Sequence, residues 1–227
     1  MPAFHFFAGM FILKELLLAD SNVCLFFFQN ERKDSYAMQL MEEMILKYGK
    51  VLPGSVLKVG SFLNQQVDSA LLRECAREVA RLYAGSGITK IVTIEASGIP
   101  FASAIALEMD VPMVFAKKHK TSNVDGDVLS AEVHSYTHDT DYTIVVSSDY
   151  ISADDTLLLA DDFLANGAAL RGLMQLAQQA GAKVAGAAIE IEKCFQNGGD
   201  ALREHGLRVE SLACIESMED GVIRFRA

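Results

Sequence analysis

The hydrophobic and polar positions of this 227-residue chain change their spacing from one segment to the next. Between residues 38 and 49 apolar side chains recur at helical intervals, which predicts an amphipathic helix. Residues 51–68 lack that spacing and predict loop and extended chain. Asp68 at their end is a typical N-cap for a second helix, which Gly85 and Gly87 close.

Further along, apolar runs alternate with helical patterns. An apolar run at 90–94, a glycine-bearing turn, a helix and another apolar run near 112–116 are typical of a βαβ unit in a buried parallel sheet. The same alternation continues near the C-terminus, with expected strands at 156–161, 183–193 and 207–215 and expected helices at 168–181 and 198–206. The pattern predicts an open, Rossmann-like, mostly parallel α/β sheet. Its ligand is expected beyond the carboxyl ends of the strands.

Residues 121–148 follow a different rule, because polar and apolar residues alternate there with period two around a turn-prone segment at 138–141. This alternation predicts an antiparallel hairpin that projects from the sheet and serves as a flap.

Composition limits the size of the hydrophobic core and the kinds of partner that the protein can bind. With 51% hydrophobic residues the chain can bury one large core with a small accessory lobe. A formal net charge of −10 argues against a large nucleic-acid surface, which depends on lysine and arginine. No C-x-x-C pair suggests a zinc or redox site, and a reducing cytoplasm is favoured for the four scattered cysteines, Cys24, Cys75, Cys194 and Cys214.

Residues 1–37 differ from the rest of the chain. They are rich in phenylalanine, but Lys14, Glu15 and Asp20 break their apolar runs into pieces too short to span a bilayer. A targeting or membrane-surface role is one interpretation. The other is an extension outside a domain that covers residues 38–227, with Met38 as an alternative start.

Several common sites are missing from the sequence. It has no phosphate-binding P-loop, no G-x-G-x-x-G after a strand, no G-x-S-x-G elbow and no H-E-x-x-H helix. Nucleotide hydrolysis, dinucleotide redox chemistry and serine hydrolysis are therefore disfavoured.

A tandem carboxylate, Asp161 and Asp162, comes where the strand at 156–161 is expected to end in a solvent-facing loop. Adjacent carboxylates suit the vicinal hydroxyls of a ribose. The small-residue turn behind them opens a helix, and its free backbone amides suit a phosphate: Ala165, Asn166, Gly167, Ala168 and Ala169. The alternative is that the aspartates only cap a turn.

Two more groups of residues follow expected strands. The turn at 93–100 offers backbone amides at Ala96, Ser97 and Gly98 for a diphosphate, or is an ordinary βα turn. The second group is a local concentration of positive charge able to bind an anion, or else a solvated loop: Lys117, Lys118, His119 and Lys120.

The strand, acidic pair and small-residue turn resemble the binding motif for 5-phosphoribosyl diphosphate (PRPP) of the type I phosphoribosyltransferases. This version departs from the common pattern, because Asn166, Ala168 and Ala169 stand where that superfamily has threonine and Gly-Thr. It is similar to the bacterial xanthine phosphoribosyltransferases. That similarity runs from about residue 38 to nearly the C-terminus, through the segments 56–68, 87–99, 111–120 and 189–195.

The resemblance implies purine salvage, with transfer of the phosphoribosyl group from PRPP to xanthine to give xanthosine 5′-monophosphate (XMP) and diphosphate. It also implies a hood, a cytoplasmic homodimer, and Mg²⁺ held mainly by diphosphate and water without protein ligands. Neither a membrane nor a nucleic acid is expected as a binding partner. Two alternatives are a hypoxanthine/guanine phosphoribosyltransferase and a non-catalytic PRPP-sensing regulator.

The resemblance further implies particular roles. Asp161 and Asp162 would be catalytic; the PRPP site would comprise Ser97, Gly98, Lys117, Lys118, Lys120 and residues 165–169, and the xanthine site Leu57, Asn64 and Lys193.

Lys193 ends an expected strand in which Ile189 and Ile191 face one side and Glu190 and Glu192 the other. Its ammonium would donate to the 6-oxo group of a purine, or is simply solvated.

Overall fold

The computed structural model describes residues 35–118, 127–135, 140–219 and 221–226. All helices and strands described belong to one compact unit, Tyr36–Ala227. No helix among the described residues combines the length and hydrophobicity needed to cross a membrane.

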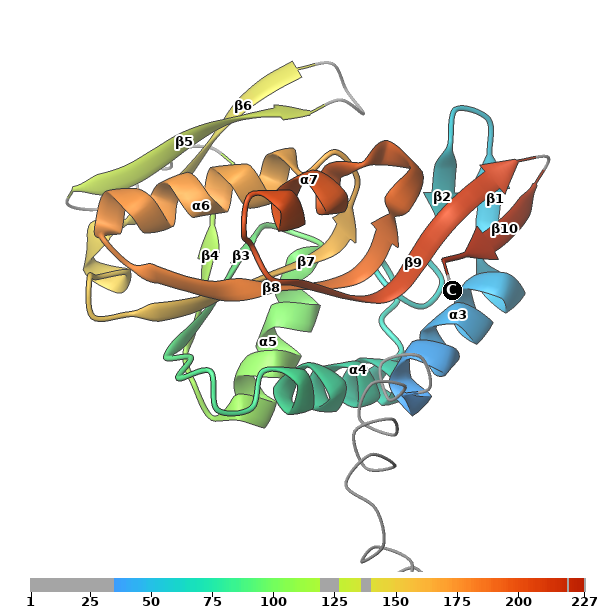
Figure 1. The fold of residues 1–227 in the computed structure, drawn as a ribbon, viewed down its shortest axis with the longest axis horizontal. Helices are drawn as coiled ribbons and strands as arrows, with labels where there is room; N and C mark the ends of the chain where they lie inside the picture. Colours follow the sequence, from blue (N-terminus) through green and yellow to red (C-terminus); the bar gives the residue numbers. More distant parts are fainter. Residues whose placement is uncertain (1–34, 119–126, 136–139, 220, 227) are drawn as a thin grey trace, which may run out of the picture. The chain divides into compact units, whose positions relative to one another are not determined.

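The centre of the unit is a six-stranded sheet with the order β10-β9-β8-β7-β3-β4 (Figure 1). All neighbouring pairs are parallel except the β10–β9 pair at one edge. The predicted mostly parallel sheet is confirmed. Its strands are β3 (Lys90–Ile94), β4 (Met113–Ala116), β7 (Thr156–Leu164), β8 (Lys183–Lys193), β9 (Val209–Glu219) and β10 (Val222–Phe225).

Helices cover both faces of this sheet (Figure 1). One face is covered by α6 (Ala168–Ala180) and α7 (Gly198–Glu204), and the other by α3 (Tyr36–Tyr48), α4 (Ser69–Leu82) and α5 (Gly98–Met109). Two single-turn 3₁₀ segments, η1 (Ser148–Tyr150) and η2 (Cys194–Gln196), follow strands. The predicted helices are confirmed, with small shifts at their ends.

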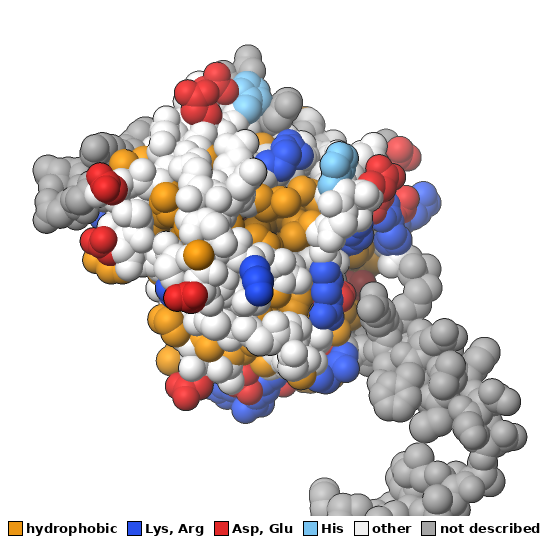
Figure 2. All heavy atoms as spheres, turned by 60° about the vertical axis from the view of Figure 1, so that its left-hand side comes forward, with side chains coloured by type: hydrophobic (Ala, Val, Ile, Leu, Met, Phe, Trp, Pro, Cys, Tyr) orange, Lys and Arg blue, Asp and Glu red, His pale blue; other side chains and the backbone are white. Residues whose placement is uncertain are grey.

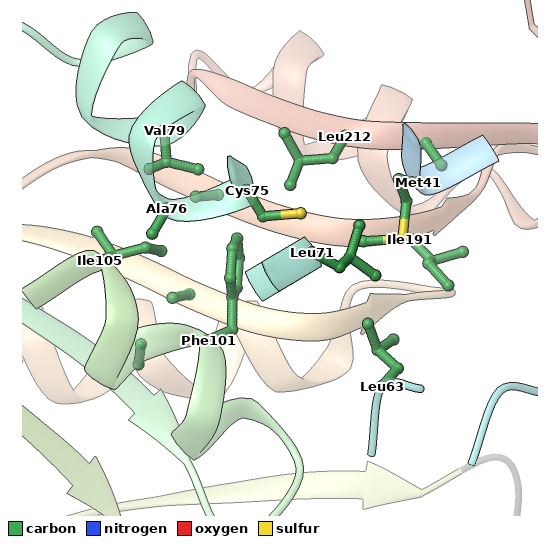
Figure 3. Close-up of a cluster of buried hydrophobic side chains, with 14 of the residues drawn as sticks. Met41, Leu63, Leu71, Cys75, Ala76, Val79, Phe101, Ile105, Ile191 and Leu212 are labelled. Atoms are coloured by element: carbon green, nitrogen blue, oxygen red, sulfur yellow. The ribbon is translucent and has the colours of Figure 1, made fainter. Parts of the chain in front are cut away.

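The core between the sheet and α3, α4 and α5 is assembled from distant parts of the chain (Figure 3). Phe101 of α5 and Cys75 of α4 are buried together with Ile191 of β8 and Leu212 of β9. Burial of a side chain the size of isoleucine or phenylalanine stabilises the fold by about 1.5–3 kcal/mol. This packing holds the strand ends against the helices.

Asp68 caps α4 as predicted, with its Oδ1 accepting hydrogen bonds from the amides of Ala70 and Leu71, both at 3.0 Å. The segment before it folds back on itself, because the Asp68 amide donates to the Phe62 carbonyl and the Gln66 amide to that of Gly60. These contacts fix the loop that carries Asn64.

Two hairpins stand outside the sheet (Figure 1). The first, β1 (Lys50–Leu52) and β2 (Val56–Lys58), forms in a segment predicted only as loop and extended chain. The second, β5 (Val128–Ser135) and β6 (Thr140–Ser147), is the predicted antiparallel hairpin. Its turn, residues 136–139, lies outside the described residues.

The acidic pair does not lie in a solvent-facing loop, so that prediction was wrong. Strand β7 continues through the pair to Leu164, because its neighbour β8 extends far enough to keep pairing: Asp161 is opposite Ile189 and Leu164 opposite Glu192. Asp162 is buried, with a fractional solvent exposure of only 6%.

The predicted separation of faces in β8 was also wrong. Ile189 packs into the cluster beneath α6, whereas Ile191 packs into the cluster beneath α4 and α5. Glu190 and Glu192 are buried as well, since helices cover both faces of the sheet here.

Candidate active site

A cleft of about 700 Å³ opens where β7 and β8 end. It brings together most of the residues that the sequence singled out: Leu57, Asn64, Ser97, Asp161, Asp162, Lys193 and the turn 165–169. Segments more than 130 residues apart in sequence thus line one cavity, at the strand edge where a ligand was expected.

Asp162 lines the cleft and receives a hydrogen bond on each carboxylate oxygen. Ser97 Oγ donates to Oδ1 at 3.0 Å, and Asn64 Nδ2 donates to Oδ2 at 3.2 Å. A buried carboxylate is costly unless such donors satisfy it. The two side chains therefore satisfy the buried carboxylate of Asp162.

Asp161 is more open, and among the described residues its carboxylate accepts a hydrogen bond from one donor, the amide of Asp162 at 3.0 Å. Burial, followed by the negative charge of Asp162 and a hydrogen bond between the two carboxyl groups, raises the pKa of Asp161 well above its ordinary value, whereas the Asp162 amide and the Lys118 charge oppose this. Among the described residues Asp161 therefore has fewer protein donors than Asp162.

The turn between β3 and α5 approaches Asp161 closely at Gly98. A Cβ at Gly98 would lie 2.9 Å from Asp161 Oδ1 and would collide with Thr93 Oγ1. Only glycine fits there without a shift of these side chains. The preceding Glu95–Ala96 peptide is cis.

Thr93 begins the segment 93–100 that the sequence singled out, although no role was assigned to its side chain. It is fully buried in β3, and its hydroxyl has no hydrogen-bond partner in the part of the chain that the structure describes.

The turn into α6 has the predicted position, with Gly167 in the left-handed region at φ 81°. The five amides are not all free, however, because Asn166 Oδ1 accepts a hydrogen bond from the Ala168 amide at 3.0 Å. The expectation of an unoccupied amide was thus wrong at Ala168, since asparagine closes a local turn with its own side chain. Arg171 Nη1 donates to the Asn166 carbonyl at 2.9 Å and steadies the turn.

Lys193 reaches across the mouth of the cleft. Its Nζ donates to the Ser55 carbonyl at 3.0 Å and lies 5.5 Å from the ring centroid of Phe163. Burial lowers the pKa of this ammonium. Leu57 supplies a buried apolar surface nearby, and Phe163, missed by the sequence analysis, adds an aromatic one.

Lys117 and Lys118 do not line this cleft. Lys117 pairs through its backbone with Val145 of β6. The Lys118 amide donates to Glu95 Oε1 at 2.7 Å, and its ammonium lies 5.4 Å from the Tyr142 ring centroid. His119 and Lys120 lie outside the described residues.

The β5–β6 hairpin contributes His134 and Tyr142 to the cleft wall, and neither was singled out from the sequence. Burial and then the Asp161 charge raise the pKa of Tyr142. Period-two alternation predicted the hairpin but not which of its faces meets the cleft.

Among the described residues, Glu192, Cys194 and Cys214 form a cluster of potential metal ligands whose ligand atoms lie within 4.8 Å of one another. The Glu192 carboxylate is already bound by Arg203, at 2.9 and 2.7 Å, so a cation would have to displace a guanidinium. In the cleft itself Asp161 offers oxygen, the ligand atom that Mg²⁺ prefers. A metal bound mostly through a ligand and water fits that sparse donor set.

With the geometry defined, comparisons with known proteins identify the class. Residues 59–216 match the family described as phosphoribosyl transferase domain, and the chain belongs to that family. The chain has the fold of two solved adenine phosphoribosyltransferases. The one from Giardia lamblia, complexed with 9-deazaadenine, has a TM-score of 0.67 and 23% sequence identity, and the match covers 78% of this chain and 98% of that one. The one from Rhodothermus marinus has a TM-score of 0.65 and 22% sequence identity, and the match covers 80% of this chain and 100% of that one.

Curated relatives are more similar in sequence. Xanthine phosphoribosyltransferases from Limosilactobacillus reuteri and Oceanobacillus iheyensis are each 50% identical to the chain, over 188 and 189 residues. The matches cover 83% of this chain and 98% and 97% of the relatives. Within the phosphoribosyl transferase domain family, the chain belongs with the xanthine phosphoribosyltransferases.

Proposed function

We propose that the protein transfers the phosphoribosyl group of PRPP to xanthine, giving XMP and diphosphate. The observation that carries this proposal is the cleft, which joins a partly engaged carboxylate, a small-residue helix start and a half-buried lysine. Those three groups match the three parts of the reacting pair: ribose, phosphate and purine. The xanthine phosphoribosyltransferases at 50% identity support the choice of base.

On the PRPP side, Asp161 would accept hydrogen bonds from ribose hydroxyls. The amides of the turn 165–169 that remain free would bind the 5′-phosphate at the start of α6, a helix of 13 residues. The amides around Ser97 and Gly98 would meet the diphosphate, and Lys117, Lys118 and Lys120 are proposed to add positive charge for it, although the first two lie outside the cleft wall and the third outside the described residues.

On the base side, the Lys193 ammonium has donors and no acceptor, so it matches a 6-oxo group and opposes the 6-amino group of adenine. Leu57 and Phe163 would cover the ring. Position 2 distinguishes xanthine from guanine and hypoxanthine, and Asn64 is the side chain proposed to read it.

A purine nitrogen would attack C1 of the ribose as diphosphate leaves, through an oxocarbenium-like transition state. The chain's contribution would be positioning and electrostatics, without a covalent intermediate. Mg²⁺, when bound with PRPP, would neutralise charge on the leaving diphosphate. We further propose a cytoplasmic homodimer whose catalytic domain is residues 38–227 together with Tyr36 and Ala37, which begin α3.

Diphosphate release with saturating PRPP and Mg²⁺ tests the proposal, in the wild type and in Lys193→Ala. We expect xanthine to support turnover and adenine not to. Lys193→Ala should lower kcat/KM for xanthine roughly tenfold to hundredfold, because it removes a charged hydrogen-bond donor. Lys183→Ala is the matched control, since Lys183 lies at the opposite end of the same strand. Equal losses in both variants would contradict the assignment of Lys193, and binding of PRPP without diphosphate release would favour a sensor.

A further inference from the structure

Asp162 connects two loops that belong to different proposed subsites. Ser97, which donates to its Oδ1, lies in the turn between β3 and α5 proposed for the diphosphate. Asn64, which donates to its Oδ2, lies in the loop before α4 proposed for the base. The two donors are 33 positions apart in the sequence, and both donate to this carboxylate.

The connection is strong because the carboxylate depends on it. Asp162 is 6% exposed and shares its surroundings with two other acids, Asp161 and Glu190. Burial, followed by the charges of Asp162 and Asp161, raises the pKa of Glu190 well above its ordinary value. Hydrogen bonds to a charged group are stronger than those between neutral groups. Ser97 and Asn64 are therefore held in place by their hydrogen bonds to this buried carboxylate.

The two aspartates consequently differ in what they can offer a substrate. Among the described residues both oxygens of Asp162 accept a hydrogen bond from a side chain of another loop, whereas the donor to Asp161 is the neighbouring backbone amide. Asp161 is therefore the carboxylate less engaged by other loops of the protein. Asp162 is suited to hold other residues in position.

We infer that Asp162 is a positioning residue that couples the two substrate subsites, by tying the Ser97 turn to the Asn64 loop. The inference rests on the proposed function for the identity of the two substrates. When PRPP orders the Ser97 turn, the carboxylate is fixed and Asn64 with it, so the base subsite is prepared. Because such coupling is reciprocal, bound base favours PRPP to the same extent.

Cross-effects on the two Michaelis constants test this inference. Asn64→Ala should raise the KM for PRPP as well as the KM for xanthine, each roughly tenfold, as expected for loss of a charged hydrogen bond. Ser97→Ala should likewise raise the KM for xanthine, and Ser97→Thr, which keeps the hydroxyl, should restore most of that loss. Gln66→Ala is the matched control, an exposed amide side chain in the same loop as Asn64.

If Asn64→Ala changes only the KM for xanthine and Ser97→Ala only the KM for PRPP, the coupling does not exist. That result leaves the proposed function standing, because the wild type still makes XMP. Failure of the wild type to make XMP would instead refute the proposed function.

A double-mutant cycle on thermal unfolding of the ligand-free protein tests the tie without any substrate. The effects of Asn64→Ala and Ser97→Ala should be non-additive, because both side chains act on one buried carboxylate. Additive effects would overturn the inference.

Discussion

At the residue scale, Asp161 of the acidic pair is a residue whose charge is unfavourable for folding. Asp161 keeps a carboxylate where burial and a second carboxylate disfavour its charge. A folded-state pKa above the unfolded value means that stability declines as pH rises from the ordinary aspartate pKa through the raised one. A residue that lowers the stability of the fold in this way is a candidate for function.

Asp161→Asn should therefore act in opposite directions on stability and on turnover. Its amide oxygen can still accept from the Asp162 amide, while the unfavourable charge is removed. We expect the Tm at pH 7 to rise by roughly 2–4 °C, corresponding to about 1 kcal/mol, and kcat/KM for PRPP to fall at least tenfold. Differential scanning fluorimetry and steady-state kinetics measure these. Asp154→Asn, at an exposed turn, is the control that should change neither. An unchanged kcat/KM in Asp161→Asn would contradict its proposed role.

Lys193 gives a pH dependence with a defined direction. Because burial lowers its pKa, the ammonium loses its proton at a lower pH than an ordinary lysine, and donation to the base weakens as pH rises through that value. Arginine remains charged throughout. We expect the KM for xanthine on the alkaline side to rise more steeply in the wild type than in Lys193→Arg, each normalised to its value at pH 7. Xanthine itself loses a proton in this pH range, but it does so equally in both experiments, so its titration cancels when the two normalised profiles are compared. Parallel profiles would exclude Lys193 as the titrating donor.

Some individual site residues could be predicted from the sequence because a local pattern marks them. The acidic pair, the turn at 165–169 and Lys193 all directly follow or end apolar runs, and the structure brings them into one cleft. His134, Tyr142 and Phe163, which also line the cleft, were missed. Their positions depend on which face of a strand meets the cleft, and that depends on packing between distant elements.

At the scale of elements, strand β8 and helix α6 were predicted closely because their hydrophobic patterns are long and their ends carry clear signals. The strands of the β1–β2 hairpin and β10 are short, with three or four residues each. Runs of that length carry too little hydrophobic pattern to predict a strand, because pairing with a neighbouring strand decides whether one forms. The extension of β7 through two aspartates contradicts local preference. It is stabilised by pairing with β8.

The start of α3 predicts different stabilities for chains that begin at Ser35 and at Met38. The helix begins at Tyr36, and Ala37 is buried, so a chain starting at Met38 removes part of its first turn. A chain starting at Ser35 should keep the Tm and kcat/KM of the full chain. One starting at Met38 should keep turnover with a Tm lower by about 2–4 °C, for roughly 1 kcal/mol. Thermal melts and kinetics of both chains check this. A folded but inactive chain from Ser35 would place residues 1–34 in the site.

At the scale of the whole molecule, the site is concentrated in a cleft and does not spread over a surface. On the face drawn in Figure 2, acidic and basic side chains are interspersed with exposed hydrophobic ones. The formal net charge is −10, yet the cleft includes Lys193 and the amides that begin α6. The proposed anion binding would thus be a property of local geometry, which net charge alone could not predict.

The central claim is that this cleft joins PRPP to xanthine in preference to other purines. Xanthine, hypoxanthine, guanine and adenine at equal concentration, competing in one vessel with PRPP and Mg²⁺, give the ratios of kcat/KM directly from the nucleotides formed. We predict that XMP is the main product by roughly tenfold or more, since one mismatched buried polar contact gives discrimination of that order, and that AMP is absent. A mixture dominated by AMP, IMP or GMP, or no nucleotide at all, would contradict the account.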